Sequence, residues 1–202
     1  CVRHHRELRH ERGDLRRRGD TGRAGGRRLA VPPRGTRPTS DRVREALFSA
    51  LDNDPGLDGA RVLDLCAGSG ALGLEALSRG AAHAVFVESD KRAVNVLRRN
   101  VSDLGLGGEV VAATVATALG GVPRGRFDVV LVDPPYAVPG EEIAGWLAAA
   151  ARGGWLAEET VVVVERDARS GVFGWPEGFE SVRERRYGDT VLHVGVRYGP
   201  AS

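Results

Sequence analysis

The chain has 202 residues, of which 42% are hydrophobic and 28% charged, and its formal net charge is +2. These values are typical of one globular domain, and the longest apolar runs fall short of the ~20 residues that a membrane-spanning helix needs. The only cysteines, Cys1 and Cys66, are too few for a disulfide framework or a cysteine metal site. We therefore expect a cytoplasmic protein with reduced thiols, no membrane contact and no metal.

Positive charge is concentrated near the N-terminus. Residues 1–45 contain fourteen arginines against six acidic residues, so they carry +8 and the other 157 residues carry −6. This asymmetry favours a basic arm that binds a polyanion. Residues 1–24 have few apolar side chains and are expected to be a disordered or non-native arm. Residues 25–55 should form an N-terminal extension with a helix, and residues 56–202 the main domain.

The predicted elements then alternate along the chain. The first is a helix over "DRVREALFSAL" (41–51), whose apolar residues recur at helical spacing after a candidate N-cap at Thr39 or Ser40. Further helices are predicted at 71–80, 91–105 and 140–154, and strands at 61–66, 83–88, 109–114, 127–133 and 160–165. The two segments 179–188 and 189–198 alternate by twos, which indicates a closing hairpin. The pattern predicts an α/β fold with a mostly parallel sheet covered by helices on both faces.

A glycine-rich loop follows the first predicted strand. In "DLCAGSGALGLEAL", Gly68, Gly70 and Gly73 form G-x-G-x-x-G between a strand and a helix, and Glu88 ends the next strand. Glycines permit a tight turn and a close approach of backbone to ligand, and an acid at the second strand's end can accept hydrogen bonds from ribose hydroxyls. The motif alone is also compatible with an NAD-dependent oxidoreductase.

Asp64 argues for a different cofactor. It lies four residues before Gly68, where its negative charge would repel the pyrophosphate of a dinucleotide. S-adenosylmethionine (SAM) instead carries a cationic sulfonium and an α-amino group, which a nearby carboxylate attracts, and it has a ribose for Glu88. The pattern D-x-x-x-G-x-G therefore favours SAM, with S-adenosylhomocysteine as the product.

The sequence "VLVDPPY" supplies a second motif at the end of a predicted core strand. Ligands of open parallel sheets bind at the carboxyl ends of the strands, so Asp133, Pro134, Pro135 and Tyr136 should lie beside the cofactor. The Asp133 carboxylate and the Pro134 carbonyl oxygen can accept hydrogen bonds from an exocyclic amine and aim its lone pair at a methyl group. The prolines fix the backbone, and Tyr136 can stack on a base turned out of its helix.

Together, "RPTSDRVREALFSAL", "LDLCAGSGALGLEALSRGA", "FVESD", "VLVDPPY" and "YGDTVLHV" resemble the bacterial 16S ribosomal RNA guanine-N2 methyltransferases of the RsmD type, from about Gly25 to Tyr198. The resemblance implies a Rossmann-like class I methyltransferase fold with a seven-stranded sheet and a C-terminal antiparallel hairpin. It implies methylation of the N2 amine of one guanine in 16S rRNA, within an assembling small subunit, by a protein that we expect to be a monomer.

The resemblance also implies roles for particular residues. The cofactor would be held by Asp64, Ala67, Gly68, Ser69, Gly70, Glu88, Ser89 and Thr114, and the amine by Asp133, Pro134, Pro135 and Tyr136. Thr114 stands where the family usually has an acid that contacts the adenine. RNA would be bound by the N-terminal segment through Arg27, Arg28, Arg37, Thr39, Asp41, Arg42 and Arg44.

These motifs are compatible with three alternatives. The motif D/N-P-P-Y/F serves adenine N6 and cytosine N4 amines as well as guanine N2, so it indicates an amine without naming the base. A non-catalytic RNA-binding module could retain the same fold. An NAD-dependent oxidoreductase lacks a suitable histidine, since His83 and His193 both fall within predicted strands. The arginine-rich arm favours RNA recognised through its phosphates and shape.

Overall fold

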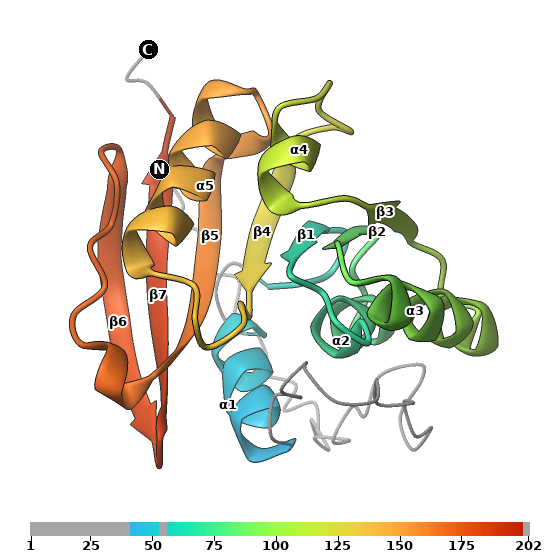
Figure 1. Cartoon of the computed structure of the whole chain (residues 1–202), viewed down its shortest axis with the longest axis horizontal. Helices are drawn as coiled ribbons and strands as arrows, with labels where there is room; N and C mark the ends of the chain where they lie inside the picture. Colours follow the sequence, from blue (N-terminus) through green and yellow to red (C-terminus); the bar gives the residue numbers. More distant parts are fainter. Residues whose placement is uncertain (1–40, 53–55, 200–202) are drawn as a thin grey trace, which may run out of the picture.

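A computed structural model describes residues 41–52 and 56–199, and it places a single seven-stranded sheet at the centre of the molecule. The predicted arm at 1–24 therefore lies outside the described residues. The strands run in the order β3-β2-β1-β4-β5-β7-β6 (Figure 1). Their bounds are β1 Arg61–Leu65, β2 His83–Glu88, β3 Glu109–Ala112, β4 Phe127–Val132, β5 Leu156–Asp167, β6 Phe179–Tyr187 and β7 Thr190–Tyr198. The first five strands are parallel, and β7 is antiparallel to both β5 and β6.

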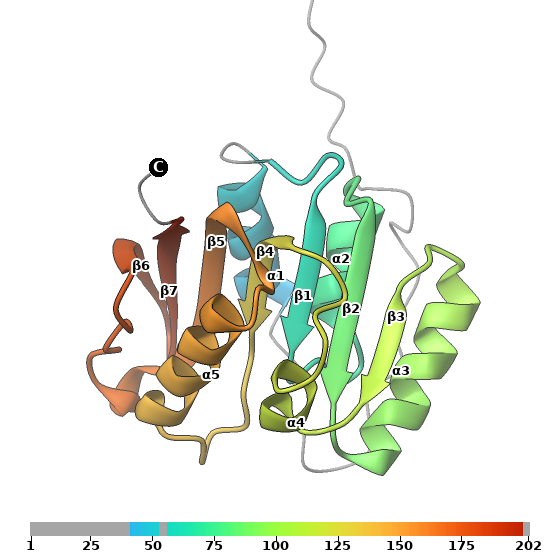
Figure 2. The ribbon, with the colours of Figure 1, turned by 90° about the horizontal axis from the view of Figure 1, so that it is seen from above.

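Helices cover both faces of this sheet, as the sequence predicts. One face packs against α1 (Asp41–Leu51), α2 (Ala71–Ser78) and α3 (Lys91–Leu104), and the other against α4 (Val115–Leu119) and α5 (Gly140–Arg152) (Figure 2). Two hydrophobic cores lie one on each face of the sheet, and successive side chains of each central strand point into them alternately. On β4, for example, Val129 and Leu131 join the first core and Val130 and Val132 the second. Both faces of the central strands are therefore apolar, which explains their uninterrupted aliphatic runs.

Most predicted elements end within two residues of the observed bounds, and two of the differences have a clear structural cause. The strand predicted over 109–114 ends at Ala112, because Thr114 caps a short unpredicted helix, α4, by accepting a hydrogen bond from the Thr117 N–H. The strand predicted over 160–165 is longer at both ends and runs from Leu156 to Asp167. Among its extra residues, Glu159, Arg166 and Asp167 pair with β7, and Leu156 pairs with Phe127 of β4.

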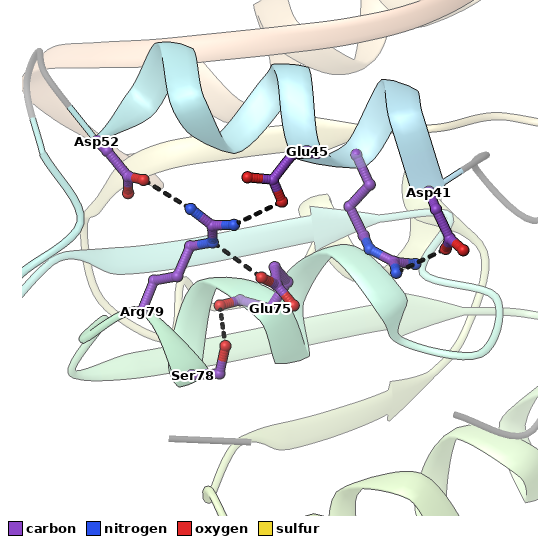
Figure 3. Close-up of polar contacts among 7 residues, drawn as sticks. Asp41, Glu45, Asp52, Glu75, Ser78 and Arg79 are labelled. Atoms are coloured by element: carbon purple, nitrogen blue, oxygen red, sulfur yellow. Dashed lines mark hydrogen bonds and ion pairs between the residues drawn. The ribbon is translucent and has the colours of Figure 1, made fainter. Parts of the chain in front are cut away.

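Arg79 ties α1 to α2. Its guanidinium lies 2.8 Å from the Glu75 carboxylate, 2.6 Å from that of Asp52 and 3.1 Å from that of Glu45, as Figure 3 shows. It also lies 5.3 Å from the ring centroid of Phe48, a fully buried residue of α1. Glu45 and Phe48 belong to α1, Asp52 directly follows it, and Glu75 belongs to α2, so one side chain holds the two helices together.

We expect Arg79→Met to lower the free energy of unfolding by about 1–3 kcal/mol, because three carboxylates lose a largely buried cation that bonds to each of them. Urea denaturation at neutral pH measures this loss. Arg98→Met, on the exposed side of α3, is the matched control and should change stability by less than about 0.5 kcal/mol. Equal stabilities for the two variants would show that the network in Figure 3 contributes nothing.

Candidate functional site

The glycine loop lies between β1 and α2, at the carboxyl end of the sheet. Gly70 has φ +85°, and a Cβ there would lie 2.5 Å from Leu97 Cδ1, while a Cβ on Gly73 would lie 2.4 Å from the Phe86 ring. These two glycines are required by packing. Gly68 also has a positive φ, +57°, but a Cβ on it would meet no atom within 4 Å. The loop is therefore packed tightly on its inner side and open at Gly68, where a ligand can approach the backbone.

Two further contacts hold this loop in place. The Asn100 side chain of α3 is buried and donates a hydrogen bond from Nδ2 to the Ser69 carbonyl oxygen at 2.9 Å. The Ala67 N–H donates to the Val87 carbonyl oxygen, also at 2.9 Å. Sequence reasoning missed Asn100, whose only local signal is a polar residue on the otherwise apolar face of a helix.

Asp64 is buried at the end of β1 beneath the loop. Its Oδ2 accepts a hydrogen bond from the Gly73 N–H at 2.9 Å, and its Oδ1 is buried with no hydrogen-bond partner. Burial raises the pKa of Asp64 to about 8; the Gly73 hydrogen bond opposes this shift, and the charges of Asp133 and Glu88 add to it. A buried carboxyl with one unsatisfied oxygen is suited to receive a positively charged ligand group.

Glu88, at the end of β2, accepts three hydrogen bonds from backbone. Its Oε2 accepts from the Gly68 N–H at 2.8 Å, and its Oε1 accepts from the Ser89 and Asp90 N–H groups, both at 2.9 Å. The side chain is 8% exposed. Glu88 therefore braces the glycine loop against β2, a contact that the sequence did not predict, and Oε2 keeps a lone pair for a further donor.

Cys66 begins the loop in a strained conformation. Its φ of +60° is the only positive φ of a non-glycine residue in the described ranges 41–52 and 56–199. Such strain is concentrated at functional sites in proteins. Burial raises the pKa of the Cys66 thiol, and the carboxylates of Glu88, Asp64 and Asp133 raise it further. The thiol is thus held unionised among three acids that converge at this edge of the sheet.

The "DPPY" segment leaves the sheet beside the glycine loop. β1 and β4 are parallel neighbours whose last registered pair is Leu65 with Val132, so Cys66 and Asp133 begin adjacent loops. Tyr136 is 66% exposed, and the Arg169 guanidinium lies 5.7 Å from its ring centroid. The structure thus brings together the two motifs that the sequence singled out, from positions about 70 residues apart.

Other predicted site residues have different surroundings. Thr114 is the N-cap of α4. Its hydroxyl accepts a hydrogen bond from the Thr117 N–H and donates one to the Thr117 hydroxyl at 2.8 Å. Of the predicted RNA-binding residues, Arg27, Arg28, Arg37 and Thr39 lie outside the described residues. Asp41 and Arg42 are exposed at the start of α1, and Arg44 donates to Asp41 at 2.8 Å.

The fold and this site define a class of protein. A sheet of order 3-2-1-4-5-7-6 with β7 antiparallel, and a glycine loop after β1, is the Rossmann-like class I methyltransferase fold. A solved structure with 17% sequence identity, a precorrin-6y C5,15-methyltransferase from Geobacter metallireducens, has the same fold, with a TM-score of 0.61 over 84% of this chain and 94% of that one. The expected fold class is confirmed.

The family follows from closer relatives. The family model described as "Conserved hypothetical protein 95" matches residues 20–196. The Escherichia coli K12 protein named ribosomal RNA small subunit methyltransferase D is 39% identical over 174 residues, 85% of each chain. The solved structure of the E. coli protein yhhF has a TM-score of 0.77 and 34% identity, over 88% of this chain and 95% of that one. The chain belongs to the family of this model, which also includes its relative ribosomal RNA small subunit methyltransferase D. The resemblance seen in the sequence is thus confirmed.

Among residues 41–52 and 56–199, no helix is long and apolar enough to cross a membrane. In the same ranges no group of three or more histidine, cysteine or acidic side chains is arranged to hold a metal ion.

Proposed function

We propose that this protein transfers a methyl group from SAM to the exocyclic N2 amine of a guanine in small-subunit ribosomal RNA. The observation that carries the proposal is the adjacency of β1 and β4, because it sets the glycine loop and Asp133–Tyr136 side by side at the carboxyl edge of one sheet. The name of the E. coli relative supports rRNA of the small subunit as the substrate class. The proposed setting is the cytoplasm, with the protein acting as a monomer.

The residues present fit the methyl donor. The buried Asp64 carboxyl has an oxygen without a hydrogen-bond partner, and with Glu88 nearby it suits a ligand carrying positive charge. The open space at Gly68 leaves room for close approach to the loop backbone, and Oε2 of Glu88 can accept from a ribose hydroxyl. When bound, SAM supplies an electrophilic methyl group on a positively charged sulfur.

Asp133 and Pro134 do the positioning in this proposal. The carboxylate of Asp133 and the carbonyl oxygen of Pro134 accept from the N–H groups of the amine, which draws its lone pair out of the ring system and toward the methyl carbon. The nitrogen–carbon bond forms as the carbon–sulfur bond breaks, and the amine proton passes through Asp133 to water. Pro134 and Pro135 have no N–H to compete for these acceptors.

The test is methyl transfer from labelled SAM to small-subunit particles that lack the modification, followed by nucleoside analysis. N2-methylguanosine is the expected product. Label on adenine or cytosine would keep the mechanism but overturn the base, and RNA binding with no label anywhere would favour a binding module.

A separate prediction concerns Glu88. We expect Glu88→Ala to weaken SAM binding by about 10- to 100-fold, because a carboxylate that accepts a charge-assisted hydrogen bond from ribose and also braces Gly68 is lost. Isothermal titration calorimetry measures the affinity. Glu177→Ala is the control, because Glu177 is exposed and lies outside the glycine loop and the strand ends beside it. This variant should bind SAM as wild type does. Unchanged affinity in Glu88→Ala would remove this residue from the site.

A further inference from the structure

A hollow beside the "DPPY" loop is lined from a second strand that the proposed mechanism does not use. Asp133–Tyr136 form one side of it, and Glu165–Asp167, at the carboxyl end of β5, form the other. The free space is small, about 30 Å³. It therefore fits the edge of a planar group rather than a whole base, which is the part of a base that carries its donors and acceptors.

Glu165 is the β5 residue nearest in register to Asp133. β4 and β5 are parallel neighbours, and their last registered pair is Val132 with Val164. The next residues are Asp133 and Glu165, on backbones ~4.8 Å apart, the usual spacing of paired strands. Glu165 is 8% exposed, so its side chain is largely shielded from bulk water, and the residue lines the hollow.

Asp167, the other acid on this side, already has a structural task. Its Oδ1 accepts from the Arg169 N–H at 2.8 Å and from Arg169 Nε at 3.0 Å, and its Oδ2 accepts from Arg169 Nη2 at 3.0 Å. Arg169 in turn lies over the Tyr136 ring. Asp167 thus fixes the arginine that covers one face of Tyr136. Glu165 lines the same hollow and lies nearer in register to Asp133.

Two neighbouring carboxylates favour a base edge that presents adjacent donors. Guanine does so, because its N1–H lies next to its N2 amino group. Adenine and cytosine instead place an acceptor nitrogen beside the exocyclic amine, and an acceptor lone pair facing a carboxylate is repelled. If Asp133 holds the exocyclic amine, a second carboxylate can therefore accept a hydrogen bond only from a base that has a ring N–H next to that amine.

We propose that Glu165 is a specificity-determining residue that selects guanine by accepting a hydrogen bond from its N1–H while Asp133 holds the N2 amine. This assignment rests on the proposed function and deepens it, because it explains why the base would be guanine. It also accounts for an acid in the wall of a hollow whose other side is already acidic.

The experiment compares guanine with 2-aminopurine at the methylated position. 2-Aminopurine keeps the 2-amino group but has an acceptor nitrogen at N1. Small-subunit rRNA carrying either base, made by ligation of transcripts to a synthetic oligonucleotide and assembled with subunit proteins, is methylated with labelled SAM. Wild-type protein should prefer guanine by roughly 10- to 100-fold in kcat/KM, the value of one charge-assisted hydrogen bond. Glu165→Gln should reduce this preference to a few-fold, because a glutamine amide can donate to N1 as well as accept from N1–H.

Controls separate this proposal from the function on which it rests. Glu159→Gln, on the same strand but exposed and six residues away from the hollow, should keep the wild-type preference. Thermal unfolding and SAM affinity of Glu165→Gln should match wild type, which excludes a general defect. Wild-type protein that methylates no rRNA guanine would overturn the proposed function. Wild-type methylation of guanine, with the preference unchanged in Glu165→Gln, would overturn the assignment of Glu165 alone.

Discussion

Asp133→Ala is expected to reduce methyl transfer by on the order of 10³-fold while leaving the affinity for SAM nearly unchanged. The reason is positional. Asp133 begins the loop after β4 and lies in the wall of the hollow, so its removal takes away an acceptor for the amine without touching the glycine loop. Single-turnover methylation of small-subunit particles measures the first effect, and calorimetry with SAM measures the second.

Asp133→Asn is the matched variant for this experiment. It preserves the size of the side chain and one carbonyl acceptor, and motifs of the form D/N-P-P-Y/F use either residue. We therefore expect it to retain far more activity than the alanine variant. Normal turnover in Asp133→Ala would overturn the mechanism. Equal and complete loss in both variants, together with normal SAM binding, would mean that the negative charge is needed and that positioning by an acceptor is insufficient.

Hydrophobic periodicity was sufficient to predict most of the fold. The apolar spacing of 41–51 and 91–105 and the aliphatic runs of 83–88 and 127–132 each correspond to an observed helix or strand. The final hairpin was marked by period-two alternation and by Gly188, which has a φ of +60° in the turn. These signals work because each element buries one stripe or both faces against the same two cores.

The errors in the fold come from interactions that a local pattern does not contain. α4 has only five residues, too few for a periodic signal, and it forms because Thr114 caps it and because Val115 and Leu119 pack into the core under β2 and β4. β5 extends to Asp167 because β7 pairs along it, and β7 begins 23 residues after β5 ends.

In the site, too, residues in local motifs were predictable from the sequence, whereas residues brought together by strand order were not. Asp64, Gly68 and Asp133 were found because each follows a core strand at a spacing tied to known chemistry. Glu165 was not singled out, although it follows four valines much as Asp133 follows "VVLV". Only the observed neighbourhood of β4 and β5 reveals that these two acids share one hollow. Strand order, unlike strand position, is not encoded in local periodicity.

Asp64→Asn is expected to stabilise the free protein as the pH rises, while weakening its binding of SAM. Asp64 has a folded pKa of about 8, against about 3.9 for an unfolded chain. Between these values the native state of the wild type holds a proton that the unfolded state has lost. Wild-type stability from this group is therefore complete below about pH 4, falls by up to roughly 1.4 kcal/mol per pH unit, and reaches its minimum above about pH 8.

Asparagine cannot ionise, so the variant lacks this decline. The difference in unfolding free energy between Asp64→Asn and wild type should grow from pH 4 to pH 8, to roughly 3–5 kcal/mol, and then level off. Urea denaturation of both proteins at several pH values measures the difference, and titrations shared by the two proteins cancel. Parallel stability curves would mean that Asp64 is already ionised in the free protein.

Binding of SAM should reverse the protonation of Asp64. The sulfonium charge favours the carboxylate, so binding at pH 7 should release about one proton from wild-type protein and almost none from Asp64→Asn. Calorimetry in buffers of different ionisation enthalpy measures this release. S-adenosylhomocysteine, which lacks the sulfonium charge, is the control ligand and should release less. Equal proton release from wild type and variant would place the ligand's charge elsewhere. Greater proton release from wild type than from Asp64→Asn, and greater release with SAM than with S-adenosylhomocysteine, would mean that the Asp64 carboxyl binds the positively charged donor. The oxygen that has no hydrogen-bond partner in the free protein would then have its partner in SAM.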